Sequence, residues 1–221
     1  MTNSPQSTQV ETSAPAMPAS PRVLIVSGPS GSGKSTLVQR LHDLPGLKFS
    51  VSSTTRPRRA TESPGKCYDF ISEAEFERRV AAGEFLEYAK VFGKHWYGTP
   101  RSQVEEARRA GLDLVLEIDV QGARQIKEKL REAVAIFIVP PSREDLERRL
   151  RDRGQDSDEA IKRRLDQARS EIACSKDYDF VVVNDDLERA GREVCAIALA
   201  LRCRRRDNEA RLQRILETFG G

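Results

Sequence analysis

Short apolar runs alternate with segments of helical periodicity along most of the chain. The apolar runs are rich in Val, Ile, Leu and Phe and have the length of buried strands. They occupy residues 22–28, 112–119, 135–139 and 180–184. Between the first two runs, residues 34–42 carry Leu37, Val38 and Leu41 at helical spacing. The alternation predicts an α/β fold with a parallel sheet flanked by helices.

One stretch interrupts this alternation. Residues 50–98 contain short β-like runs of their own, which are FSVSS, KCYDFI and EFLEYAKVF. Strand-like runs so close together do not fit one more βα unit. The stretch is therefore predicted to form a small inserted lobe.

Two helix starts can be predicted from capping signals. Ser72 and Glu75 have the spacing of a capping box, and the helix that they open is expected to end at Gly83. Thr99 and Pro100 have the residue types of an N-cap and a first helical position, which predicts a second helix there.

The chain divides into a tail, one domain and a short extension. Residues 1–20 are rich in Ser, Thr, Pro and Gln and are expected to be disordered. An arginine-dense stretch, LERRLRDRGQDSDEAIKRRL, predicts two helices around a glycine corner and a mobile lid. The predicted parts are the tail at 1–20, a domain at 21–205 with a core at 21–49 and 99–205, a lobe at about 50–98, a lid at about 143–165, and a C-terminal helix at 206–221.

Composition narrows the partners and the location. Hydrophobic residues make up 38% and charged residues 32% of the chain, and the formal net charge is +3, as expected of a globular protein with a mixed surface. The arginines of residues 202–206 could form a nucleic-acid patch, but acidic neighbours favour an exposed helix face. The four cysteines show no metal or disulfide spacing, and no run approaches the ~20 apolar residues of a membrane span. We expect a cytoplasmic protein without a nucleic-acid or membrane partner.

The segment GPSGSGKS matches the phosphate-binding P-loop, GxxxxGK[ST], directly after a predicted strand and at the start of a helix. Backbone N–H groups of such a loop surround phosphates, Lys34 would contact the β- and γ-oxygens of ATP, and Ser35 would ligate Mg²⁺. The alternative, a chance Gly/Ser-rich turn, does not explain the strand–helix context. The predicted ATP-contacting residues are Gly28, Pro29, Ser30, Gly31, Ser32, Gly33, Lys34, Ser35 and Thr36.

Asp119 follows a predicted strand at the sheet edge where ligands bind in open α/β folds. It is predicted to support the magnesium ion together with Ser35. The alternative is that Asp119 caps the helix that follows, and both roles are compatible.

Several further motifs occur in order along the chain. They are SVSSTTRPRR, the segment around Tyr68, EFLEYAKVFG, WYGTP, LEIDVQGARQI, PPS, LRDRGQDS and VNDD. With the P-loop, they make the chain resemble the guanylate kinase family from about residue 22 to residue 205. The resemblance implies a P-loop NTPase core, a GMP-binding lobe and a lid over ATP. The implied reaction converts ATP and GMP to ADP and GDP, which supplies GDP for guanine nucleotide synthesis and recycling.

The resemblance also implies roles for residues of the lobe. The GMP phosphate is expected to meet Arg56, Arg59, Tyr68 and Tyr97, and the guanine is expected to meet Ser52, Glu87, Thr99 and Glu117. Glu117 stands where the family commonly has an aspartate near the base. Taken singly, these residues would be solvated loop arginines, half-buried aromatics, a strand hydroxyl, a surface carboxylate or an N-cap.

The remaining implied roles concern the lid and the ATP side. Arg149, Arg153 and Arg164 match lid positions that stabilise the transferred phosphoryl group, and Asn184 matches a position near adenine. An arginine in so basic a stretch could instead be solvated, and Asn184 could form a turn. The predicted catalytic residues are Lys34, Arg56, Arg153 and Arg164.

Three other functions fit parts of the pattern. A catalytically inactive scaffold of the same fold should have a degraded P-loop, and this P-loop is intact. A kinase acting on a ribose phosphate should lack the set at Ser52 and Glu87, and a partner-coupled NTPase is the third alternative. Association into a homo-oligomer is left open.

Overall fold

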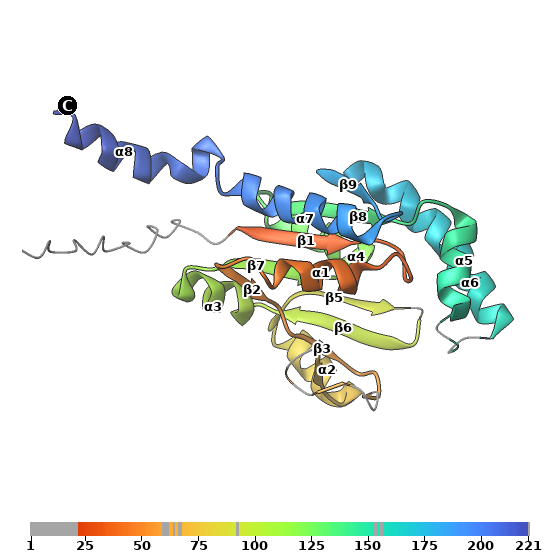
Figure 1. Cartoon of the computed structure of the whole chain (residues 1–221). Coiled ribbons are helices and arrows are strands. Elements are labelled where there is room, and N and C mark those ends of the chain that lie inside the picture. Colours follow the sequence, from red (N-terminus) through yellow and green to blue (C-terminus); the bar gives the residue numbers. More distant parts are fainter. Residues whose placement is uncertain are drawn as a thin grey trace, which may run out of the picture.

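The computed structural model describes residues 22–58, 62–63, 65, 68–91, 93–152, 154 and 157–220 (Figure 1). The predicted tail at residues 1–20, and with it Arg59, Cys67 and Arg153, lies outside the described residues.

The main sheet has five parallel strands in the order β2-β7-β1-β8-β9. Its strands are β1 (Val23–Ser27), β2 (Leu47–Phe49), β7 (Asp113–Glu117), β8 (Val134–Val139) and β9 (Phe180–Val183). The four predicted strands are confirmed. The edge strand β2 was not predicted, because three half-buried residues carry too little pattern to stand out.

Helices cover both faces of this sheet (Figure 1). They are α1 (Lys34–Leu41), α3 (Ser102–Ala110), α4 (Val120–Lys129) and α7 (Leu187–Leu201). Because successive strand side chains point to opposite faces, Leu24 and Val26 of β1 pack with α1 and α7, whereas Val23 and Ile25 pack with α3 and α4. The central strand is buried on both sides, as its continuous apolar run predicted.

A second sheet of four strands forms the inserted lobe, in the order β4-β3-β6-β5. Its strands are β3 (Ser52–Thr54), β4 (Tyr68–Phe70), β5 (Phe85–Val91) and β6 (His95–Pro100), and α2 (Glu73–Ala81) packs on it. Phe76 of α2 stacks on Phe85 and Trp96 of the sheet. The run FSVSS, predicted as one β-like unit, is divided between the sheets, since Phe49 ends β2 and Ser52 begins β3.

The two predicted helix starts have different outcomes. Ser72 caps α2 by accepting a hydrogen bond from the Glu75 N–H at 3.2 Å, which confirms the first. The second is wrong, because Thr99 and Pro100 end β6 and α3 begins at Ser102. Pairing of β6 with β5 holds Thr99 in an extended conformation and overrides its local capping preference.

The arginine-dense stretch forms two helices, α5 (Arg143–Asp152) and α6 (Asp158–Ala173), as predicted. Gly154, with φ +60°, lies at the corner between them. The pair has a small core of its own, formed by Leu146, Leu150, Ile161, Leu165 and Ala168. The 3₁₀ helix η1 (Cys174–Asp177) follows α6.

At the C-terminus, the 3₁₀ helix η2 (Arg205–Asn208) leads into α8 (Glu209–Thr218), which extends away from the sheets (Figure 1). Of the arginines predicted to form an exposed helix face, Arg205 and Arg206 are exposed, whereas Arg202 and Arg204 are half-buried. Arg205 pairs with Glu209, and Arg206 pairs with Glu132. None of the helices in the described ranges is long and apolar enough to cross a membrane.

The buried Asp113 carboxylate accepts hydrogen bonds from the backbone N–H and from Nε of Arg22, at 3.1 and 2.8 Å, and lies 3.6 Å from Arg202 Nε. Because Asp113→Ala would leave these groups without their carboxylate, we expect it to lower the free energy of unfolding by about 3 kcal/mol. The melting temperature should fall by about 6–12 °C. The effect should be confined to stability, because Asp113 begins β7, at the opposite end of the strand from the sheet edge where ligands bind in open α/β folds. In the control Glu209→Ala, which removes an exposed ion pair, stability should change by less than about 1 kcal/mol. Equal effects of the two variants would contradict the role given to Asp113.

Candidate active site

A cavity of about 490 Å³ lies between the carboxyl edge of the main sheet and the second sheet. It brings together most of the predicted residues, which are Gly28, Ser30, Gly31, Gly33, Lys34, Ser35, Thr36, Ser52, Tyr68, Glu87, Tyr97, Glu117, Asp119 and Arg164. Arg59 and Arg153 lie outside the described residues. The other predicted residues, Pro29, Ser32, Arg56, Thr99, Arg149 and Asn184, contact or adjoin the lining residues.

The loop between β1 and α1 has the conformation of a phosphate-binding loop. Gly28 has φ +141°, and a Cβ there would lie 2.1 Å from the carbonyl oxygen of Ile138 in β8, so only glycine fits. Gly33, with φ +92°, precedes the first residue of α1, so the N–H groups of the helix start open toward the cavity. Lys34 Nζ donates to the carbonyls of Gly28 and Pro29 at 2.6 and 3.0 Å.

Two predicted residues hydrogen-bond to the backbone of this loop. Asn184 is 5% exposed, and its Nδ2 donates to the Ser32 carbonyl at 2.7 Å. Arg149 donates to the carbonyl oxygen of Asn184 at 2.7 Å and to that of Ser32 at 3.5 Å. The amide of Asn184 is thus engaged by the loop, and its predicted contact with adenine stays a prediction.

Arg164 links helix α6 to the same loop. It lies on α6, and its NH1 group donates to Ser30 Oγ at 2.8 Å. A guanidinium at this point faces the space where the loop would hold phosphates.

Glu117, the last residue of β7, and Asp119, two residues beyond it, have different surroundings. Ser35 Oγ donates to Glu117 Oε1 at 2.6 Å, so Glu117, expected near guanine, lies beside the P-loop serine. Asp119 caps α4, because its Oδ1 accepts from the Gly122 N–H at 2.8 Å, which confirms the alternative role. Burial raises the pKa of Asp119, and the N–H groups at the helix start oppose that shift.

The predicted guanine residues form a buried polar cluster. Glu87 of β5 is 3% exposed and accepts from Thr99 Oγ1 of β6 at 2.6 Å. The hydroxyls of Thr99 and Ser52 are 3.3 Å apart. Burial raises the pKa of Glu87 to about 7, despite the hydrogen bond from Thr99. A Cβ at Gly122 would lie 2.5 Å from Glu87 Oε2, so this glycine makes room for the carboxylate.

The predicted phosphate residues of the lobe lie around one guanidinium. Arg56 Nε donates to the Tyr97 hydroxyl at 3.2 Å, and the guanidinium carbon lies 5.5 Å from the ring centroid of Tyr68. The other side of the Arg56 fork donates to both oxygens of Glu62, at 3.0 and 2.7 Å. Burial, and next the Glu117 carboxylate, raise the pKa of Tyr68, so its hydroxyl stays a hydrogen-bond donor.

Sequence reasoning missed three residues of this site. Glu62 follows Arg56 in a loop, where the spacing of residues does not indicate which way a side chain points. Gly122 lies inside a helix, where a glycine costs about 1 kcal/mol relative to alanine and could have signalled a close approach. Glu171 lines the cavity, accepts from Gln167 Nε2 at 2.7 Å, and has a pKa raised by burial. Its signal was the seven-residue spacing from Arg164, which places both on one face of α6.

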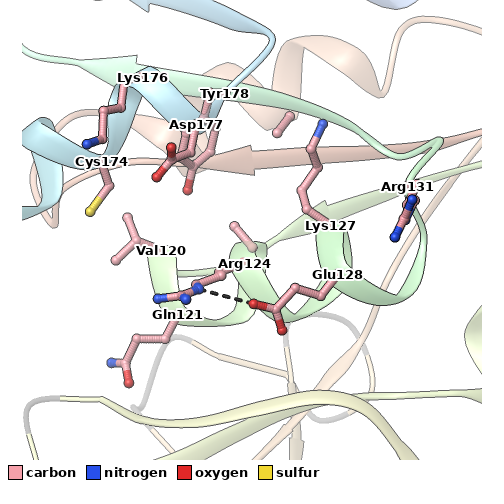
Figure 2. Close-up of a pocket in the computed structure, with 12 residues that line it drawn as sticks. Val120, Gln121, Arg124, Lys127, Glu128, Arg131, Cys174, Lys176, Asp177 and Tyr178 are labelled. Carbon is pink, nitrogen blue, oxygen red and sulfur yellow. Dashed lines mark hydrogen bonds and ion pairs between the residues drawn. The ribbon is translucent and has the colours of Figure 1, made fainter.

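A second cavity, of about 770 Å³, lies between α4 and η1 (Figure 2). Among the described residues, none of those predicted for the site lines it. Arg124 on its rim pairs with Glu128 at 3.1 Å, as Figure 2 shows, and Lys127 pairs with Asp179 at 2.8 Å. The predicted chemistry therefore belongs to the smaller cavity.

Comparisons with known proteins agree with this geometry. A family model described as guanylate kinase matches residues 20–199. A guanylate kinase of Symbiobacterium thermophilum is 48% identical over 205 residues, which are 91% of this chain and 97% of that protein. One of Neisseria gonorrhoeae is 52% identical, over 83% of this chain and 89% of that protein. The crystal structure of guanylate kinase from Anaplasma phagocytophilum superposes with a TM-score of 0.69 at 35% identity and covers 86% of this chain and 90% of that one. Because the family model covers the P-loop, the second sheet and the helix pair α5–α6 together, and the relatives match most of the chain, the chain belongs to the guanylate kinase family.

Proposed function

We propose that the P-loop side of the cavity binds ATP and the second-sheet side binds GMP, so that the γ-phosphoryl group passes directly between them to give ADP and GDP. The observation that carries this proposal is that one cavity holds both an intact P-loop and a buried carboxylate suited to guanine. The guanylate kinase relatives support the same reaction.

Glu87 is the residue that selects the base. Guanine presents two adjacent donors, N1–H and the N2 amine, and a carboxylate can accept from both. Adenine presents an acceptor at N1 and no amine at C2, which would leave the buried carboxylate unpaired. Ser52 donates to O6 at the other edge of the base, and Thr99 holds Glu87 in place.

Arg56, Tyr68 and Tyr97 bind the GMP phosphate. A guanidinium and two phenols suit a dianion, and Glu62 fixes the orientation of the Arg56 fork. Arg59, outside the described residues, keeps its predicted place in this set.

The oxygen atoms beside the P-loop fit a magnesium ion. Ser35 Oγ and the Glu117 carboxylate lie together, and Asp119 lines the same cavity, so the donors are of the hard type that Mg²⁺ prefers. Bound there with ATP, Mg²⁺ would neutralise charge on the β- and γ-phosphates. The position of Glu117 favours a role on the metal side over the predicted contact with guanine.

The protein's contribution to the reaction is positioning and electrostatics. A GMP phosphate oxygen attacks the γ-phosphorus in line, and no covalent enzyme intermediate or strong general base is required. Lys34 and Arg164 stabilise charge on the transferred group, and the lid excludes water that would otherwise hydrolyse ATP. Arg153 keeps its predicted role in the lid. The wide spacing of the cysteines agrees with the predicted cytoplasmic location.

Lys34→Met should lower kcat for GMP phosphorylation by at least about 100-fold, because it removes a donor to the transferred phosphoryl group. The KM for GMP should change little, since Glu87 lies on the second sheet and Arg56 lies in the loop that follows β3 of that sheet. A coupled assay of ADP formation measures both, and the wild type should turn over with GMP but not with AMP, CMP or ribose 5-phosphate. Near-normal kcat in the variant would contradict the P-loop assignment.

The KM for GMP should rise as the pH falls below about 7, by up to about tenfold per pH unit. Burial raises the pKa of Glu87 to about 7, so the carboxylate that accepts from guanine is lost by protonation below that pH. The control is Glu87→Gln, which should lower kcat/KM for GMP by about one to two orders of magnitude and abolish this pH step. The ionisation of the GMP phosphate, near pH 6, should remain in both proteins. Identical pH profiles would show that Glu87 does not meet the base.

Glu117→Gln should raise the free Mg²⁺ concentration needed for half-maximal rate by about tenfold or more. The reason is that a neutral amide would hold the hydroxyl of Ser35, the predicted Mg²⁺ ligand, less firmly than the carboxylate does. The measurement is the initial rate against Mg²⁺ at fixed ATP and GMP. Glu106→Gln, which changes a carboxylate paired with Lys48 at the protein surface, is the matched control and should behave as wild type. An unaltered Mg²⁺ dependence in Glu117→Gln would return Glu117 to the guanine side.

A further inference from the structure

Strand β5 carries Glu87 and lies at the edge of the second sheet. Among the described strands, β6 alone pairs with it, so on its other side the backbone groups of alternate residues need partners. Helix α4, which belongs to the core, packs along this edge. The guanine-selecting strand therefore contacts both the lobe and the core.

Two side chains of α4 bind the edge of β5 on either side of Glu87. Gln125 Nε2 donates to the Tyr88 carbonyl at 2.7 Å, and Gln125 Oε1 accepts from the Tyr88 N–H at 3.3 Å. Lys129 Nζ donates to the Leu86 carbonyl at 2.5 Å. We call Gln125 and Lys129 the α4 clamp.

The spacing of the clamp suits a strand. Residues four apart on a helix rise by about 6 Å, and residues two apart in a strand are separated by about 6.8 Å. Gln125 and Lys129 can therefore reach the backbone of Tyr88 and of Leu86, although the pairing of β5 with β6 is irregular at Leu86. A shift of β5 along α4 would break all three hydrogen bonds.

Glu87 lies between the two residues of β5 whose backbone groups the α4 clamp binds. Its Oε2 approaches Gly122 on the same helix, where a Cβ would lie 2.5 Å away. Helix α4 begins just after β7, the strand that ends with Glu117 of the P-loop side. The position of the base-selecting carboxylate is thus linked through α4 to the site of phosphoryl transfer.

We propose that Gln125 and Lys129 are positioning residues for base selection, which act by holding β5, and with it Glu87, in register with α4. This inference rests on the proposed role of Glu87 as the residue that contacts guanine. A carboxylate that is slightly displaced loses one of two adjacent hydrogen bonds before it loses both. Loosening β5 should therefore reduce discrimination between bases that differ in a single donor.

The test compares GMP with IMP, whose base lacks the 2-amino group and is otherwise the same. Gln125→Met keeps the length of the side chain and removes both hydrogen bonds to Tyr88. We expect kcat/KM to fall about tenfold for GMP and about threefold or less for IMP, so that the GMP-to-IMP ratio narrows. The KM for ATP should stay unchanged.

Arg124→Met is the matched control. Arg124 precedes Gln125 on α4, its side chain is 83% exposed, and it pairs only with Glu128 among the contacts of the described residues. This variant should keep the GMP-to-IMP ratio of the wild type. The melting temperature of each variant shows whether it is folded. If Gln125→Met is not folded, Lys129→Met provides a second test.

Glu87→Gln, measured in parallel, separates the two proposals. A narrowed ratio in Glu87→Gln, Gln125→Met and Lys129→Met supports the clamp. If Glu87→Gln narrows the ratio while the two clamp variants lower GMP and IMP turnover equally, the clamp is only structural and the inference is wrong. If Glu87→Gln leaves the ratio unchanged, the guanine assignment fails, and the inference fails with it.

Discussion

The close approach of the phosphate-binding loop to β8 is the constraint on which the site depends. Gly28 lies against the backbone of Ile138, at a distance that no side chain would allow. The turn can therefore lie close to the sheet and place Lys34 and Ser35 at the start of α1. Asn184, which directly follows the edge strand β9, then donates to the Ser32 carbonyl and holds the loop in place. One glycine contact thus sets the distance between the phosphate-binding loop and the sheet.

The second half of the site is built on a buried charge. Ionising a carboxyl group as buried as that of Glu87 costs free energy, and burial therefore raises the pKa of Glu87 to about 7. Thr99 offsets part of this cost, and Gly122 leaves the space that the carboxylate fills. In the proposed function, a base with two donors would offset this cost on binding, so the weak solvation of Glu87 and the proposed selectivity for guanine would have the same physical origin.

The fold was largely predictable because its signals are local. Continuous apolar runs predicted β1, β7, β8 and β9, and the capping box predicted the start of α2. The errors arose where partners distant in sequence decide the conformation. Strand β2 exists because it pairs with β7, and Thr99 is extended because β6 pairs with β5, although its residue type favours a helix N-cap.

For the site, the sequence by itself determined the P-loop and the family motifs, because their chemistry follows from residue types at fixed spacing. It could not determine which carboxylate meets which ligand. Glu117 and Asp119 are two residues apart on the chain, yet one lies beside Ser35 and the other caps α4. The contacts of Glu62 with Arg56 and of Gln125 with Tyr88 likewise depend on how a loop folds back and how a helix packs on an edge strand. Only the tertiary structure decided these points, because side-chain direction is set by the packing of elements and not by the order of residues.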